Sequence, residues 1–171
     1  MSALAAALLA FCEWCNGSFF GHAIRDSVWL FPFVEIFHLL ALALLGGTLL
    51  LINLRLLGVR FGADPTAVLA RELRPWMLGS LIVMLVSGFL LFSTEAVKMY
   101  GNWAFQLKML CLVLATVFTF TIHRRVTSRE GASSALRWTT VAVSSLLWLA
   151  VGLGGRALGY VTTAVSAVTG G

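Results

Sequence analysis

Four apolar stretches dominate this chain, and each is long enough to cross a lipid bilayer as a helix. They cover residues 28–54, 76–94, 103–122 and 138–160. About 20 helical residues are needed to cross roughly 30 Å of hydrocarbon. With 60% hydrophobic and only 11% charged residues, the composition does not suit a soluble domain. We therefore predict an all-α integral membrane four-helix bundle that forms a single transmembrane domain over residues 1–171, with the lipid bilayer as its surroundings.

The basic residues indicate how the chain is oriented. Eight of the twelve Lys and Arg residues lie in the two connections that follow the first and third stretches, namely Arg55, Arg60, Arg71, Arg74, Arg124, Arg125, Arg129 and Arg137. By the positive-inside rule these connections are cytoplasmic. We expect a multi-pass protein of the bacterial inner membrane with both termini in the periplasm. The net charge of +5 is thus a topology signal, and no nucleic-acid partner is expected.

Residues 1–22 precede the first span and contain an apolar run too short to cross the membrane. This run has no Lys or Arg in residues 1–9, so it does not resemble a cleaved signal. We predict a short interfacial helix on the outer side. It carries Cys12 and Cys15 in a C-E-W-C motif, which can form a disulfide or remain as two thiols. Covalent haem attachment would need His at position 16, where the chain has Asn16.

Several ionisable residues lie inside or just above the predicted spans. With the orientation above, one level near the outer surface collects Glu35, His38, Glu95, Lys108 and Arg156, with His22 and Arg25 just above it. Ionisable groups at membrane depth are costly and are usually paired, liganded or functional. One interpretation is a set of structural ion pairs; the other is that the cluster binds a ligand.

A b-type haem is the ligand that we predict. It needs an axial imidazole, small residues beside the flat ring, and cations for its propionates. His38 is the expected axial ligand, His22 the sterically feasible second one, and Arg25, Lys108 and Arg156 the candidate cations. The small residues that thin the facing helices are Gly46, Gly47, Gly88, Gly152, Gly154 and Gly155. His123 is at the opposite end, where we expect an interfacial residue; a second haem there is the alternative.

Other chemistries remain open at the same residues. Glu35 and His38 are spaced i, i+3, as in the carboxylate-bridged metal sites of four-helix bundles. A copper, zinc or iron ion held by His38, His22, Glu35 and Glu95 is therefore an alternative to haem. A quinone head group is a further candidate ligand, and it is compatible with haem. Motifs of hydrolases and phosphate-binding loops are absent from the sequence.

Several segments resemble an uncharacterised family of small bacterial four-helix inner-membrane proteins with a domain of unknown function. The resemblance rests on SVWLFPxVExxH at residues 27–38, NLRLLG at 53–58, Lys108-Met109, Ile122-His123, SLLW at 145–148 and Gly155-Arg156. It covers residues 23–160 and implies a four-helix membrane fold, but no activity. The architecture is more loosely similar to that of four-helix membrane cytochromes b and copper-resistance membrane proteins.

The function predicted from these observations is electron transfer by a small inner-membrane haem b protein, to or from quinone. The competing hypothesis is a non-enzymatic scaffold or accessory subunit with a structural polar cluster. In either case we expect a homo-oligomer or a subunit of a larger membrane complex.

Overall fold

A computed structural model describes the backbone of residues 3–59, 65–129 and 132–169, and the side chains of residues 6–59, 65–129 and 132–155. Every regular element in these ranges is helical. Arg60 and the side chain of Arg156 lie outside the described part of the chain. The structure divides into two compact units, residues 1–44 with 79–103 and residues 45–78 with 104–171.

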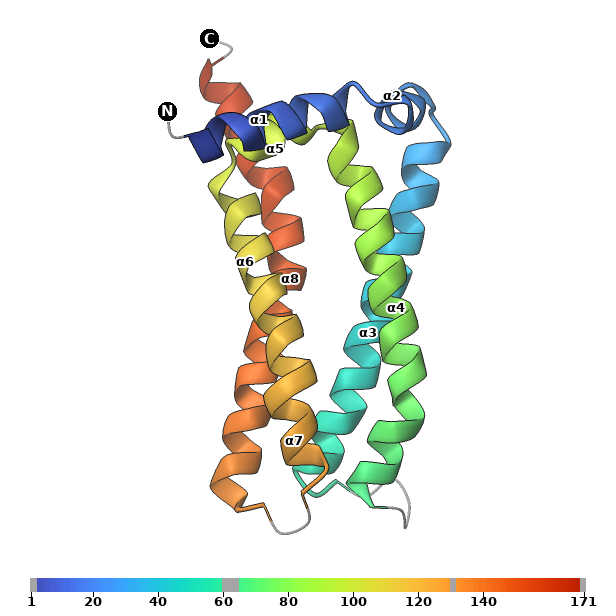
Figure 1. The fold of residues 1–171 in the computed structure, drawn as a ribbon, viewed down its shortest axis with the longest axis vertical. Coiled ribbons are helices and arrows are strands. Elements are labelled where there is room, and N and C mark those ends of the chain that lie inside the picture. Colours follow the sequence, from blue (N-terminus) through green and yellow to red (C-terminus); the bar gives the residue numbers. More distant parts are fainter. Residues whose placement is uncertain (1–2, 60–64, 130–131, 170–171) are drawn as a thin grey trace. The chain divides into compact units, whose positions relative to one another are not determined.

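Among the described residues, four helices are long and apolar enough to cross a membrane, which confirms the predicted fold class. They are α3 (Leu30–Leu56), α4 (Thr66–Thr94), the continuous segment Trp103–Thr127, and α8 (Ser134–Thr169), whose described apolar part is Ser134–Gly155. Within the third span, α6 (Trp103–Phe118) passes into a π-helical segment, η1 (Thr119–His123), and then into α7 (Arg124–Thr127). Helices α3 and α4 run through both units (Figure 1). Many large apolar side chains of these helices are exposed, which suits contact with lipid.

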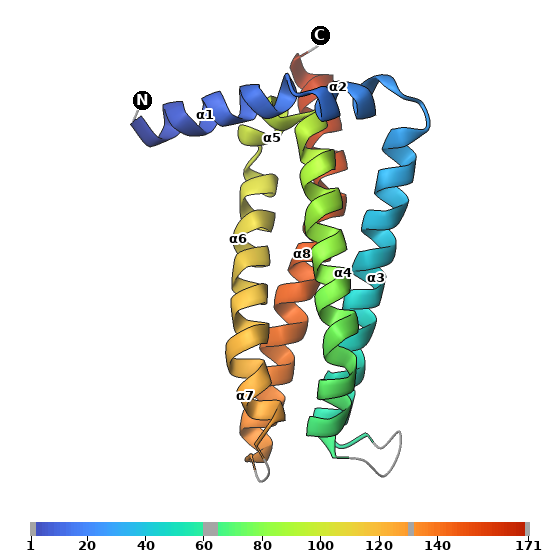
Figure 2. The same ribbon diagram turned by 45° about the vertical axis from the view of Figure 1, so that its right-hand side comes forward.

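The first unit contains the N-terminal helices and one end of α3 and α4. Helix α1 (Ala3–Asn16) lies across the end of α4, and α2 (Phe19–Asp26) leads into α3 (Figures 1 and 2). Ser18 caps α2 by accepting a hydrogen bond from the Gly21 amide. The interfacial segment predicted for residues 1–22 is thus two helices, which extend four residues further along the chain.

Helix α1 packs on α5 (Ala96–Tyr100), the short helix after α4. Cys12 and Cys15, one turn apart on α1, are buried against Ala96, with Phe92 and Tyr100 beside them. Most large apolar side chains elsewhere on α1 are exposed, Trp14 by 68%. One face of α1 therefore holds the unit together, while the other suits a lipid interface.

Helix α4 begins ten residues before the predicted span. We predicted a connection before residue 76 and a span from that residue, but α4 runs without a break from Thr66 through Pro75. Proline removes a single backbone donor, and the helical bonds on either side persist. Arg71 and Arg74 therefore belong to the first turns of a long helix rather than to a loop.

The second unit joins the other ends of α3 and α4 to α6, η1, α7 and α8. An apolar cluster of Leu56, Val126 and Val141 brings α3, α7 and α8 together. The π-helical turn at Thr119–His123 was not predicted, since the extra residue it accommodates does not interrupt the apolar pattern.

Gly21 provides the first testable prediction. A Cβ at this position would lie 2.7 Å from the Ser93 carbonyl oxygen and 2.9 Å from that of Cys15, and both are backbone atoms. We expect Gly21→Ala to destabilise the protein by about 1–3 kcal/mol, as overpacking does. Thermal unfolding in detergent measures this change.

The matched control is Gly79→Ala on α4, where a Cβ would meet nothing within 4 Å. This variant should unfold at the temperature of the unmodified protein or above it, because Ala favours helix. Equal unfolding temperatures for Gly21→Ala and the unmodified protein would show that α2 does not pack closely on α4.

Candidate functional site

His38 lies half-buried on α3, where its ring contacts α4. Its Nδ1 is 3.0 Å from the Ser87 Oγ. Ser87 in turn donates its hydroxyl hydrogen to the Val83 carbonyl oxygen at 2.6 Å. When the Ser87 hydrogen is donated to the Val83 carbonyl, the Ser87 oxygen accepts from His38, and Nδ1 carries the proton. In neutral His38, Nε2 then bears the lone pair, which is the form that ligates a metal.

Gly88 allows this close approach. A Cβ at Gly88 would come within 3.1 Å of His38 Cε1 and 3.5 Å of Nδ1. Any larger residue would push the imidazole away from Ser87. Of the six glycines predicted beside a cofactor, Gly88 is the one that contacts the predicted axial ligand directly.

The other predicted ligands of this unit have different surroundings. His22 on α2 and Glu35 on α3 are exposed. Glu95 is also exposed and forms an ion pair with Lys98, with 3.4 Å between the Lys98 Nζ and the Glu95 Oε1. Within the part of the chain that has described side chains, no group of three or more His, Cys, Asp or Glu could hold a metal ion. The structure thus does not assemble His22, Glu35, His38 and Glu95 into one such group.

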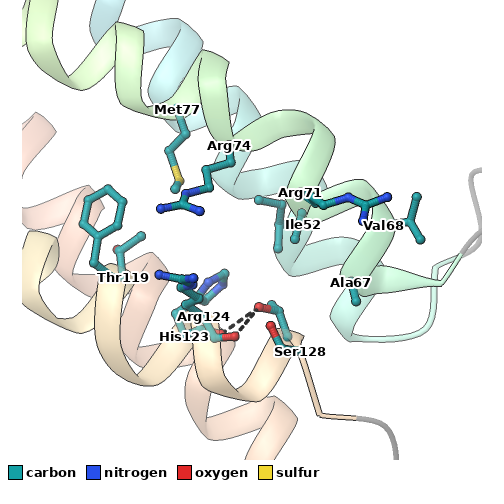
Figure 3. Close-up of a pocket in the computed structure, with 13 residues that line it drawn as sticks. Ile52, Ala67, Val68, Arg71, Arg74, Met77, Thr119, His123, Arg124 and Ser128 are labelled. Atoms are coloured by element: carbon teal, nitrogen blue, oxygen red, sulfur yellow. Dashed lines mark hydrogen bonds between the residues drawn. The ribbon is translucent and has the colours of Figure 1, made fainter.

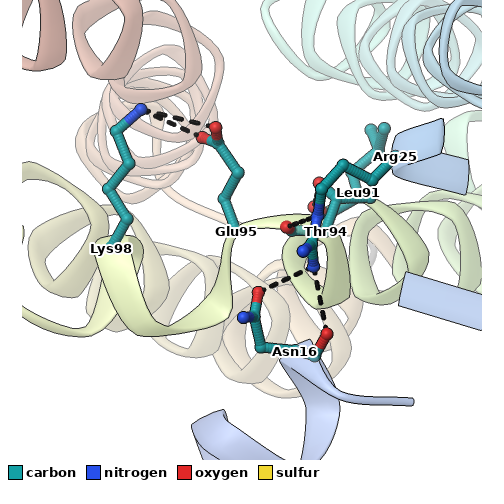
Figure 4. A network of polar contacts seen from close by, with 6 residues as sticks. All are labelled: Asn16, Arg25, Leu91, Thr94, Glu95 and Lys98. Atoms are coloured by element: carbon teal, nitrogen blue, oxygen red, sulfur yellow. Dashed lines mark hydrogen bonds and ion pairs between the residues drawn. The ribbon is translucent and has the colours of Figure 1, made fainter. Parts of the chain in front are cut away.

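Arg25 has a structural role that the sequence did not reveal. Its Nη2 donates to the backbone oxygen and to the side-chain Oδ1 of Asn16, at 3.0 and 2.9 Å. Its Nε donates to the Thr94 carbonyl at 2.9 Å (Figure 4). Asn16 and Thr94 are the last residues of α1 and α4, whose final carbonyls lack helical partners. A guanidinium that binds both helix ends also complements their dipoles.

Lys108 belongs to the second unit, where its side chain packs against α8. The Cβ position of Gly154 lies 3.3 Å from the Lys108 Cβ, and that of Gly155 lies 3.3 Å from Nζ. These two glycines therefore make room for the lysine side chain along α8. A Cβ at Gly46 or Gly47 would meet nothing within 4 Å, so these glycines line open surface. The convergence of Lys108 and Arg156 with His38 stays a prediction.

His123 is 3% exposed, so its side chain packs inside the protein. Its Nε2 is 2.7 Å from the Asn53 Oδ1, an acceptor, and therefore carries a proton. The Asn53 Nδ2 donates to the Ser145 Oγ at 3.3 Å. The resulting network ties η1, α3 and α8 together. Asn53 was detectable as the one amide within the first apolar stretch, but its partner was not.

Trp148 extends the polar contacts between the third and fourth spans. Its Nε1 donates to the Thr119 Oγ1 at 3.0 Å, from α8 to the start of η1. Thr119 is 2% exposed, so this bond satisfies a buried hydroxyl. The π-helical turn is therefore held at both of its ends by side chains from other helices.

The two cysteines of the C-E-W-C motif are free thiols that are almost fully buried. Burial raises the pKa of Cys12 above its ordinary value of 9.0, and the nearby Cys15 and Glu13 add to the effect. Burial also raises the pKa of Cys15. The packed state thus favours protonated thiols. The stability that these protonated thiols contribute is fully present below pH 9 and is lost as the pH rises through the raised pKa.

We expect these thiols to react slowly with a water-soluble maleimide at pH 7, and much faster above pH 9 as α1 loosens from α5. The measurement uses a Cys111→Ala background, so that only the pair reacts. Single Cys12→Ser and Cys15→Ser variants assign the rates. Labelling at pH 7 as fast as that of a model thiol would contradict the buried packing of α1.

No curated protein and no solved structure matches the chain. A model of a family of unknown function, DUF6644, matches residues 11–161. This confirms the resemblance to an uncharacterised family and supplies no activity. The chain belongs to the family of unknown function DUF6644.

Proposed function

We propose that this protein is a small haem b protein of the bacterial inner membrane, that it transfers electrons, and that His38 is the axial ligand. The observation that carries the proposal is the hydrogen-bond chain from the His38 Nδ1 through Ser87 to the Val83 carbonyl. Axial and metal-bound imidazoles are usually oriented by such a bond from the second ring nitrogen.

The residues around His38 suit a fixed ligand. Ser87 sets the proton on Nδ1 and raises the basicity of Nε2. Gly88 lets the ring lie close to α4, since a Cβ at this position would be 3.1 Å from the His38 Cε1. Because both residues lie on a helix and not on a loop, the imidazole has little freedom to rotate.

The remaining predicted residues have secondary roles in this proposal. His22 on α2 is the candidate second axial ligand, and Lys108 and Arg156 are the candidate partners of the propionates. Arg25 already binds two helix ends through its Nε and Nη2. It therefore contributes chiefly by holding α2, and with it His22, in place.

A bound b-type haem supplies a one-electron couple whose potential depends on its axial ligands and on hydrogen bonds to them. We propose a quinone or a second membrane protein as the redox partner. The arginine-rich connections are assigned to the cytoplasm and both termini to the periplasm. Open glycine surface at Gly46 and Gly47 is suited to contact with another helix, in a homo-oligomer or a larger complex.

One observation favours the competing scaffold function. Two members of the predicted polar cluster already have partners within the protein: Arg25 binds the ends of two helices, and Glu95 forms an exposed ion pair with Lys98. An accessory subunit needs such bonds but needs no bound cofactor. A visible absorption spectrum of the purified protein distinguishes the two functions.

We expect the protein, expressed with a haem precursor, to show a Soret band and, after reduction, sharp α and β bands. His38→Ala should abolish these bands, and added imidazole should restore them in part. Ser87→Ala should weaken haem binding by about 10- to 100-fold, as loss of such an outer partner does. It should also raise the midpoint potential, because a less basic imidazole stabilises the oxidised iron less.

Ser93→Ala is the matched control, since this buried serine on α4 donates to the Phe89 carbonyl of its own helix. It should leave the spectrum and the potential unchanged. His22→Ala should convert a low-spin spectrum to high-spin if His22 is the second ligand. A colourless, stable protein, or a His38→Ala variant with an unchanged spectrum, would exclude the haem proposal and favour the scaffold.

A further inference from the structure

A cavity of about 360 Å³ lies in the second unit, between the start of α4 and the π-helical turn. This volume falls within the range of small-molecule sites. Helices α3 and α4 form one wall, and η1 and α7 form the other. The proposed haem site does not use any of the residues that line it.

Three arginines line this cavity, Arg71 and Arg74 on α4 and Arg124 on α7. Figure 3 shows Arg74 extending into the cavity, with His123 and Arg124 on the facing wall. Among the described lining residues there is no Asp or Glu. Like charges that share a cavity repel one another, so three guanidiniums without a carboxylate favour an anionic ligand.

The cavity also has an apolar side. Ile52 and Met77 are buried in it, and Phe120 of η1 is partly buried. A free inorganic anion makes no use of such a surface. A ligand with an anionic group and an attached hydrocarbon chain uses both sides, and bilayer lipids have this chemistry.

The depth of the arginines agrees with a lipid head group. Helix α4 has 29 residues, about nine more than the roughly 20 needed to span the hydrocarbon. Arg71 and Arg74 lie in this excess, within nine residues of the start of α4. Trp76 follows and is 61% exposed, as expected of an aromatic ring at the membrane interface.

The π-helical turn is an independent indication of a site. Thr119, Phe120 and His123 all belong to this turn and all line the cavity. Single π-helical turns inside α-helices occur frequently at functional sites. Here the turn is held by Trp148 on one side and by Asn53 on the other, so the wall is rigid.

We propose that this cavity binds the phosphate of an anionic membrane lipid through Arg74 and Arg124, with Arg71 at its edge. Guanidiniums bind phosphate oxygens with paired, charge-assisted hydrogen bonds. Basic pockets between transmembrane helices bind anionic head groups in this way. The acyl chains then lie along Met77 and Phe120.

The test is native mass spectrometry of delipidated protein in detergent, titrated with phosphatidylglycerol or with phosphatidylcholine. Phosphatidylglycerol should bind one to one and more tightly than phosphatidylcholine, which carries a cation beside its phosphate. The double variant Arg74→Gln, Arg124→Gln should bind phosphatidylglycerol at least about tenfold more weakly, since hydrogen bonds to charged groups are lost.

Arg125→Gln is the matched control. Arg125 adjoins Arg124 on α7 and is also exposed, but it does not line the cavity. It should change the affinity by less than about twofold, because isolated surface charges contribute little. All variants should have the same unfolding temperature without lipid, which shows that weaker binding is not caused by lost folding. If the double variant unfolds, the variants Arg74→Lys and Arg124→Lys replace it.

Inorganic phosphate alone distinguishes the two sources of the anion. If inorganic phosphate raised the unfolding temperature as much as phosphatidylglycerol does, and through the same arginines, the ligand would be a soluble phosphate compound and not a lipid. Equal binding of both lipids, or equal losses in Arg125→Gln and in the double variant, would overturn the proposal.

Discussion

Hydrocarbon offers no hydrogen bonds, so every polar group that enters a membrane must find its partner within the protein. Backbone groups meet this requirement by forming helices, which explains why all regular elements in the described residues are helical. Several side chains meet it in one of two ways, although the buried Ser144 Oγ has no hydrogen-bond partner. Ser93 and Thr121 bond back to carbonyls of their own helix, at Phe89 and Val117. Ser87, Asn53 and Trp148 also bond to other helices, and these contacts set which helices meet.

The two histidines inside the spans satisfy the same constraint through opposite ring nitrogens. His38 uses Nδ1 toward Ser87, whereas His123 uses Nε2 toward Asn53. The first arrangement presents Nε2 as the basic nitrogen of a neutral ring, which suits a ligand. The second occupies Nε2 and connects η1 to α3, which suits a structural contact. A second haem at His123 through Nε2 would require the bond to Asn53 to break.

Arginines serve different purposes in the two units. Arg25 in the first unit binds the carbonyl ends of α1 and α4, and its charge is matched by helix dipoles. Arg71, Arg74 and Arg124 in the second unit line a cavity without a described acidic residue. The charge of Arg25 is therefore compensated within the protein, whereas the three cavity arginines favour an external anion. The proposed redox and lipid sites both involve α3 and α4 but use different residues of these helices, so they are testable independently.

The sequence by itself determined the four spans, their apolar character and the helical N-terminal segment, because these depend on hydrophobic length and composition along the chain. It also identified His38 as an unusual residue, since a lone imidazole in an apolar run is visible without coordinates. The sequence did not reveal that α4 continues through Pro75, nor that the third span contains a π-helical turn. Both features depend on packing between helices rather than on local pattern. Only the tertiary structure decided that Ser87 orients His38, that Asn53 holds His123, and that Arg25 joins two helix ends. Those partners lie 49, 70 and 69 residues apart, and side-chain hydrogen bonds act over about 3 Å, so sequence spacing carries no record of them.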